Sequence, residues 1–202
     1  MKIRVLSILV LLSCNSYKIS NSESEILNSL SDFLHSEYPK NFVLSPYSSQ
    51  SILESDIVAK DSLGNIVDYH FIADGYTTFS RYKDSLDFLD LKDNYLLSNN
   101  NSILIQKHFK SITYDTLAID NFKSIFHTDN TLSNQWASFY KNYPDVEGYL
   151  IISRPGISTD KKWAIIFYEI QQNSLDGEGK FVLFKKISNK WKVIESINKW
   201  VS

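Results

Sequence analysis

Glu169 is the acid in this chain with the strongest case for proton transfer. It lies near the end of an apolar run, 163–171 (WAIIFYEIQ), which is typical of a buried strand. Side chains alternate between the faces of a strand, so Glu169 shares a face with Trp163 and Phe167. A carboxyl group in apolar surroundings has a raised pKa and can act as a general acid. The alternative is that Glu169 meets solvent or Lys185 at the strand end.

Asp68 and His70 form a second pair with catalytic chemistry. Two residues apart on a strand, they lie on the same face. A carboxylate that orients an imidazole is the arrangement of a general base, and the competing interpretation is a surface ion pair. Arg154, in the segment Ser153-Arg154-Pro155-Gly156, is a candidate anion ligand or a residue that stabilises a turn. We assign none of these residues as catalytic.

The sequence contains no motif for a metal or cofactor. Its histidines follow no metal-ligand spacing, and its single cysteine excludes a thiolate zinc site. It also lacks a nucleophile elbow, a phosphate-binding glycine loop and a dinucleotide fingerprint. We therefore expect no metal and no cofactor. The histidines are His35, His70, His108 and His127.

The first fourteen residues carry a targeting pattern. Lys2 and Arg4 precede the apolar run 5–12, which is too short to span a bilayer as a mature helix. The segment 11–14 (LLSC) resembles the lipobox of bacterial lipoproteins, and that resemblance implies cleavage before Cys14 and acylation of this cysteine, with palmitate among the expected modifications. An ordinary signal peptide that happens to contain a cysteine is the alternative.

Three segments follow from this interpretation. Residues 1–13 are the expected lipoprotein signal peptide, residues 14–24 the lipidated cysteine and a flexible Ser/Asn-rich tether, and residues 25–202 a single α+β domain. The expected location is the bacterial cell envelope, where Cys14 inserts its acyl chains into membrane lipid. The sequence does not select a membrane or leaflet.

The last quarter of the chain predicts a four-stranded antiparallel meander. Short turns join the apolar runs 149–153, 163–171, 181–184 and 191–200, and connections this short link antiparallel neighbours. Apolar residues occupy both parities of the two middle runs, so we expect cover on both faces.

Two amphipathic helices, 25–37 and 131–142, are predicted to pack on this curved antiparallel sheet. Residues 84–97 fit a helix or two short strands, whereas 102–106 and 112–119 are predicted strands.

The charge balance argues against a nucleic-acid partner. The formal net charge is −2, which becomes about −4 without Lys2 and Arg4, and nucleic-acid binders usually carry a basic stripe. Lysines do gather in the final hairpin. They either protect a strand edge from pairing with other chains or bind an anionic ligand or lipid surface. These lysines are Lys180, Lys185, Lys186, Lys190, Lys192 and Lys199.

The C-terminal seventy residues contain a recognisable series of motifs. Ser153-Arg154-Pro155-Gly156, Gly177-x-Gly179, the Lys190-Trp191 pair and the terminal Trp200-Val201-Ser202 together resemble a group of bacterial secreted proteins and lipoproteins without an assigned activity. That resemblance implies no catalytic residue, and this chain lacks the cysteine that such proteins often carry at 169–174. The final hairpin is also similar to the end of cone-shaped folds of the nuclear-transport-factor-2 (NTF2) type.

Two functions remain compatible with these residues. One is a membrane-anchored, non-enzymatic binding module with a possible protein partner in the envelope. The other is a small NTF2-like hydrolase or isomerase that uses Glu169, or Asp68 with His70, inside a cavity. A ligand-sized cavity around Glu169 favours the enzyme, and a filled core with an exposed aromatic patch favours the binding module.

Overall fold

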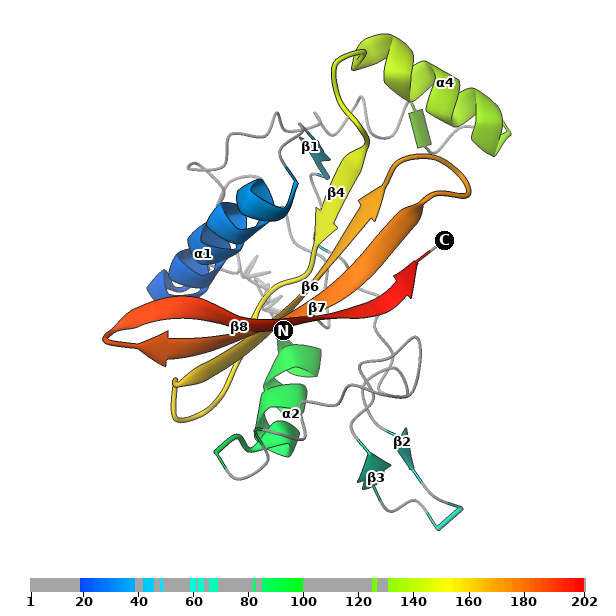
Figure 1. Cartoon of the computed structure of the whole chain (residues 1–202). Helices are drawn as coiled ribbons and strands as arrows, with labels where there is room; N and C mark the ends of the chain where they lie inside the picture. Colours follow the sequence, from blue (N-terminus) through cyan, green and yellow to red (C-terminus); the bar gives the residue numbers. More distant parts are fainter. Residues whose placement is uncertain are drawn as a thin grey trace, which may run out of the picture.

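The structure, a computed structural model, describes residues 19–38, 42–45, 48, 59–60, 62–63, 66–68, 82, 85–99, 125–126 and 131–201. Its main sheet has the strand order β1-β4-β6-β7-β8, with β5 also paired to β6 (Figure 1). These strands are β1 (Val43–Leu44), β4 (Tyr149–Ile152), β5 (Gly156–Ile157), β6 (Trp163–Gln171), β7 (Gly177–Ile187) and β8 (Lys190–Val201). A separate pair consists of β2 (Ala59–Lys60) and β3 (Ile66–Asp68). The protein is α+β.

The predicted meander is confirmed. Strands β4, β6, β7 and β8 pair antiparallel with one another in this order. The β7–β8 turn has only two residues, Ser188 (φ 49°) and Asn189 (φ 61°). Positive φ at both positions gives the backbone twist that suits a tight hairpin, so this turn fixes Ile187 opposite Lys190.

Two short strands, β4 and β5, pair one after the other with the same edge of β6. Both β4 and β5 pair antiparallel with β6, and residues 153–155 interrupt the ladder between them. Ser153 bridges this gap: its backbone N–H donates to the carbonyl oxygen of Phe167, and its Oγ accepts from the backbone N–H of Phe167 at 2.8 Å. Beyond β4, the two-residue β1 pairs in parallel, so the sheet is mixed.

Helix α1 (Asn21–Glu37) covers one face of the sheet, as its apolar periodicity predicts (Figure 1). It begins with a complete capping box, in which Ser20 Oγ accepts from the Glu23 backbone N–H and the Glu23 carboxylate accepts from the Ser20 N–H. Its apolar side is packed against the side chains of one face of β6 and β7. This core includes Ile26, Leu27, Leu30, Leu34, Ala164, Ile166, Tyr168, Ile170, Val182 and Phe184.

Helix α2 (Phe88–Ser98) covers the opposite face of the sheet. The ambiguous segment 84–97 is thus mainly helical. Leu91 and Tyr95 pack against the alternate residues of β6 and β7, among them Phe167. The helix lies very close to β5: a Cβ atom added to Gly156 would stand 2.4 Å from the Tyr95 Cα. A side chain at position 156 would therefore push the helix off the sheet.

Helix α4 (Leu132–Asn142) is the second predicted helix, and it begins at its N-cap, Thr131. It packs at the β1 and β4 side of the molecule through an aromatic cluster rather than over the centre of the sheet (Figure 1). Trp136 stacks on Tyr149 with ring centroids 5.5 Å apart. The middle strands are thus buried between α1 and α2, and α4 extends the core at one end.

Several sequence expectations lie outside the described residues. These are the signal peptide, Cys14, His70 and the strands predicted at 102–106 and 112–119. Among the helices that the structure describes, none has the length and apolar character needed to cross a membrane.

Candidate functional site

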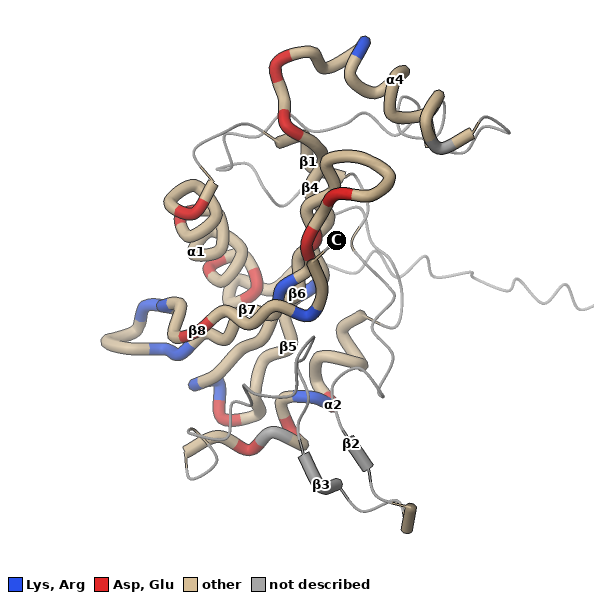
Figure 2. Tube along the Cα trace, turned by 45° about the vertical axis from the view of Figure 1, so that its right-hand side comes forward, with Lys and Arg blue, Asp and Glu red and all other residues tan. Residues whose placement is uncertain are grey.

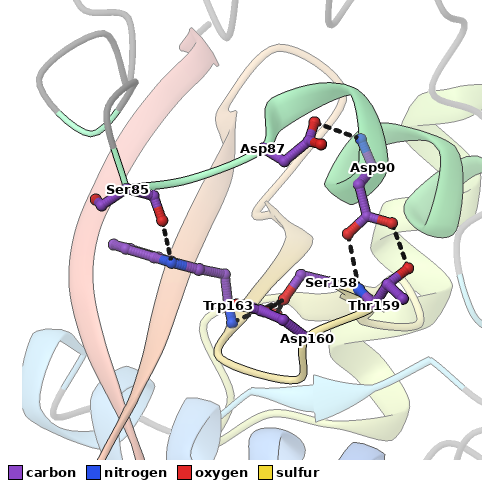
Figure 3. Close-up of a pocket in the computed structure, with 7 residues that line it drawn as sticks. All are labelled: Ser85, Asp87, Asp90, Ser158, Thr159, Asp160 and Trp163. Atoms are coloured by element: carbon purple, nitrogen blue, oxygen red, sulfur yellow. Dashed lines mark hydrogen bonds between the residues drawn. The ribbon is translucent and has the colours of Figure 1, made fainter.

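A solvent-accessible pocket lies between the start of α2 and the turn that joins β5 to β6 (Figure 3). Its volume is about 380 Å³, within the lower part of the range of small-molecule sites. One wall is the indole of Trp163, and most of the remaining lining is polar. The lining residues are Ser85, Asp87, Asp90, Ser158, Thr159, Asp160 and Trp163.

Two aspartates of α2 shape one side of the pocket. Asp87 is the N-cap of the helix, where its Oδ1 accepts a hydrogen bond from the Asp90 backbone N–H at 3.1 Å. Asp90 in turn accepts from the backbone N–H of Thr159 at 2.7 Å and from the Thr159 hydroxyl (Figure 3). The Asp90 carboxylate therefore ties the first turn of the helix to the β5–β6 turn.

The β5–β6 turn organises the other side of the pocket. Ser158 Oγ donates to Asp160 Oδ1 at 2.7 Å and accepts from the Trp163 backbone N–H at 3.0 Å. Asp160 also accepts from the Lys162 backbone N–H at 2.9 Å. The hydrogen bonds from Ser158 and Lys162 lower the pKa of Asp160, so this carboxylate is ionised at neutral pH.

The indole wall is held by contacts on both its edge and its face. Trp163 Nε1 donates to the carbonyl oxygen of Ser85 at 3.0 Å. Lys185 Nζ lies 4.6 Å from the centroid of the ring, in the range of a cation–π contact. Trp163 is 2% exposed, so its indole is packed in the core behind the pocket.

The chemistry of this lining suits a ligand that donates hydrogen bonds. Ionised carboxylates accept hydrogen bonds and do not donate them, so the pocket favours a ligand with hydroxyl or ammonium groups. The lining residues include no histidine or lysine to serve as a base for the serine and threonine hydroxyls. No group of three or more His, Cys, Asp or Glu in the described part of the chain is placed to hold a metal ion.

Glu169 lies on the predicted face of β6, but it is not among the residues that line this pocket. It is half-buried, opposite Ile151 on β4 and Gly179 on β7. Burial raises the pKa of its carboxyl group, and a long hydrogen bond from Gln171 at 3.5 Å opposes this shift only in part. Its negative charge also adds to the raised pKa of Tyr149, which burial takes to about 12.

Arg154 occupies a buried structural site. Its guanidinium group donates through Nη2 and Nε to Glu23 Oε1, at 2.7 and 3.2 Å, and through Nη1 to the carbonyl oxygen of Ser98. Its backbone N–H and C=O bond to the side-chain amide of Asn99. A carboxylate of the same chain therefore binds the guanidinium, and Arg154 links the start of α1 to the end of α2.

The other predicted site residues are Asp68, His70 and Cys14, whose side chains the structure does not describe. Asp68 is the last residue of β3. Arg154 binds Glu23, whereas Glu169 accepts a hydrogen bond from Gln171. Neither Glu169 nor Arg154 lines the pocket beside Trp163.

Sequence reasoning missed two arrangements. The pocket aspartates carried one usable signal, since Asp87 precedes the helical run as an N-cap does. A second cluster joins Tyr38 of the α1 end to Tyr168, Glu178 and Lys180. Burial and hydrogen bonding to Glu178 raise the pKa of Tyr38. The separation of more than a hundred residues left no local pattern from which to predict this cluster.

Comparison of the chain with protein-family models, curated proteins and solved structures finds no match.

Proposed function

We propose that the protein is a lipoprotein of the bacterial cell envelope whose folded domain is a non-enzymatic binding module. The anchor is Cys14, for which the support is the basic residues, the short apolar run and the LLSC segment that precede a polar tether. Membrane lipid is the partner of the acylated cysteine. The ligand of the folded domain is a small molecule, or an exposed group of an envelope protein, that carries hydroxyl or ammonium donors.

The observation that carries the binding proposal is the pocket beside Trp163. Its acceptor groups are held in place by contacts within the protein, so a ligand meets a preorganised surface. The exposed large apolar side chains of the described residues do not form an aromatic patch. They are all aliphatic: Leu63, Leu89, Leu97, Leu175, Ile187 and Val201. The pocket, rather than an aromatic surface, is therefore the binding site that we propose.

The binding experiment is a calorimetric titration of the purified protein with two panels, neutral sugars and primary amines. Asp160→Asn removes one negative charge from the pocket wall without altering the size of the side chain. We expect this variant to weaken the binding of an amine about tenfold and to affect a neutral sugar less, because charge-assisted hydrogen bonds are the stronger ones. Asp145→Asn, an exposed aspartate outside the pocket, is the matched control.

Two results would contradict this proposal: no binding by any member of either panel, or equal loss of binding in the Asp145 and Asp160 variants. Photo-crosslinking from position 159, at the pocket rim, then tests the protein partner in intact cells. A partner captured from position 159 and also from position 145 would not be specific to the pocket.

The alternative function, a hydrolase or isomerase based on Glu169, has one specific observation in its favour. Burial raises the pKa of this carboxyl group, which is the direction of shift that a general acid requires. Glu169 lies on the face of the sheet that α2 covers, and the centre of this face is closely packed: Phe167, Phe181 and Tyr95 are each at most 1% exposed. Activity that disappears in Glu169→Gln and survives in Asp160→Asn would establish the enzyme.

A further inference from the structure

Six lysines gather at one end of the main sheet, which we call the basic end. The β5–β6 turn and the tip of the β7–β8 hairpin lie side by side there, because the Lys186 backbone N–H donates to the Lys162 carbonyl oxygen at 2.8 Å. Figure 2 shows blue segments close to the tip of the β7–β8 hairpin. The basic end consists of Lys161, Lys162, Lys185, Lys186, Lys190 and Lys192.

Negative charge gathers at the other end of the same strands. Asp176 and Glu178 lie at the β6–β7 turn, and Asp145 and Glu147 lie in the connection from α4 to β4 (Figure 2). The protein therefore has a charge asymmetry along its strands that the net charge of −2 conceals. Such an asymmetry orients a protein in the field of a charged surface.

Two lysines of the hairpin repel each other and so destabilise the folded sheet. Lys185 and Lys192 are direct cross-strand partners, and like charges in this position destabilise a sheet. The contact of Lys185 with the Trp163 ring offsets part of this repulsion. Lys190 and Lys192 are exposed, and the tip also presents Ile187, which is 39% exposed. An apolar side chain between solvated lysines suits the interface of a bilayer with anionic headgroups.

Protection of the β8 edge explains only some of these residues. Lys190 and Lys192 lie on β8, the last strand of the described sheet. Lys161 and Lys162 precede β6, which is two strands away from that edge. Lysines that only block edge pairing are not needed there. Their position beside the hairpin tip instead extends a lysine-rich surface across the end of the sheet. Within this surface Asp160 pairs with Lys162 and Glu25 pairs with Lys186, so the lysines still outnumber the carboxylates.

The basic end lies next to the point where the lipid anchor joins the domain. Cys14 precedes the α1 N-cap, Ser20, by six residues, which span at most about 20 Å when fully extended. The first half of α1 runs beside the hairpin (Figure 1): Glu25 Oε2 lies 3.7 Å from Lys186 Nζ, and Ser29 Oγ donates to the Trp191 carbonyl oxygen. A bilayer that holds Cys14 is therefore within reach of the hairpin.

We propose that the basic end docks on anionic lipid headgroups of the membrane that holds Cys14. This inference rests on the lipid anchor of the proposed function. The acyl chains retain the protein at the bilayer, and the lysines set the orientation of the domain, with the acidic end directed away from the lipid. Each lysine near an anionic surface contributes about a fivefold increase in the docked population, so two charge reversals at the tip change it strongly.

The test reconstitutes the acylated protein in vesicles of phosphatidylcholine, with or without phosphatidylglycerol, and with a nitroxide quencher on the lipid headgroup. A fluorophore is attached to Ile187→Cys at the basic end or to Leu175→Cys at the β6–β7 turn, both exposed positions. Cys14 is the only native cysteine, and acylation blocks its thiol. We expect strong quenching at position 187 and weak quenching at position 175 in the anionic vesicles. Lys190→Glu with Lys192→Glu, or high salt, should remove most of the difference, because both weaken the attraction of the basic end to the anionic headgroups.

Three results would overturn this inference. The first is equal quenching at positions 187 and 175. The second is quenching at position 187 that does not depend on phosphatidylglycerol. The third is an equal effect on this quenching of Lys190→Glu and of Lys141→Glu, an exposed control on α4. A separate outcome concerns the anchor. Maleimide labelling of the otherwise unaltered chain would show a free Cys14 thiol, and it would refute the lipid anchor independently of where the domain docks.

Discussion

Arg154 and Glu23 form a buried ion pair between parts of the chain that are 131 residues apart. The Nη2–Oε1 distance is 2.7 Å, and the two side chains are 11% and 9% exposed. Glu23 also closes the capping box of α1, and Arg154 also binds the carbonyl oxygen of Ser98 at the end of α2. One guanidinium group therefore connects the two helices that cover opposite faces of the sheet.

Removal of this guanidinium group should destabilise the whole domain. We predict that Arg154→Met lowers the free energy of unfolding by about 3 kcal/mol, because Glu23 is left charged and without its partner. Urea denaturation followed by circular dichroism measures the change. Lys162→Met is the control, since its ion pair with Asp160 is 69% and 48% exposed and contributes at most about 1 kcal/mol. Equal effects of the two substitutions would show that the buried pair has no special role.

The contact between Gly156 and Tyr95 predicts a strong steric effect. Gly156→Ala places a methyl group 2.4 Å from the Tyr95 Cα, where only a shift of the α2 backbone can relieve the clash. We expect a loss of stability of about 2 kcal/mol. Because α2 also carries Asp87 and Asp90, the pocket should deform as well, which calorimetry with the pocket ligand detects. Unchanged stability and binding in Gly156→Ala would mean that α2 does not lie against β5 as described.

The N-cap of α2 gives a smaller prediction at the same site. Asp87→Ala removes the acceptor of the Asp90 backbone N–H and should cost about 1 kcal/mol. Asp87→Asn keeps a capping oxygen and should recover most of this stability, so the pair of variants separates capping from charge. Thermal unfolding distinguishes them. If Asp87→Asn destabilises the protein as much as Asp87→Ala does, then Asp87 stabilises the helix through its negative charge and not through its capping hydrogen bond.

Glu169 predicts a specific dependence of stability on pH. Its folded-state pKa is raised above the ordinary value of 4.5, so the folded state binds the proton more tightly than the unfolded state does. This contribution to stability is complete below pH 4.5 and is lost as the pH rises through the folded-state pKa. Glu169→Gln should therefore stabilise the protein at pH 8 relative to the unsubstituted chain, by an amount that shrinks below pH 4.5. A stability difference that does not vary with pH would contradict a raised pKa.

Local patterns predicted the framework of this protein well. The spacing of Ile26, Leu30 and Leu34 predicted the face of α1 that is buried, and the both-parity apolar run of β6 predicted cover on two sides. The residue alternation also placed Glu169 correctly beside Phe167. These features depend on periodicity along a single element, which the sequence displays directly.

Features that depend on distant partners were not predictable in this way. No local signal pairs Arg154 with Glu23 or Tyr38 with Lys180. Residues 84–97 were ambiguous because their apolar residues fit two periods, and contact with β5 and β6 makes them a helix. The pocket itself forms only when Asp90 meets Thr159, 69 residues later in the chain.

The most direct test of this account is mass spectrometry of the mature protein extracted from the membrane fraction. We predict an N-terminal peptide that begins at Cys14 and carries acyl chains, while Cys14→Ala remains uncleaved or moves to the soluble fraction. A mature protein that retains residues 1–13, or whose Cys14 is unmodified, would contradict the account.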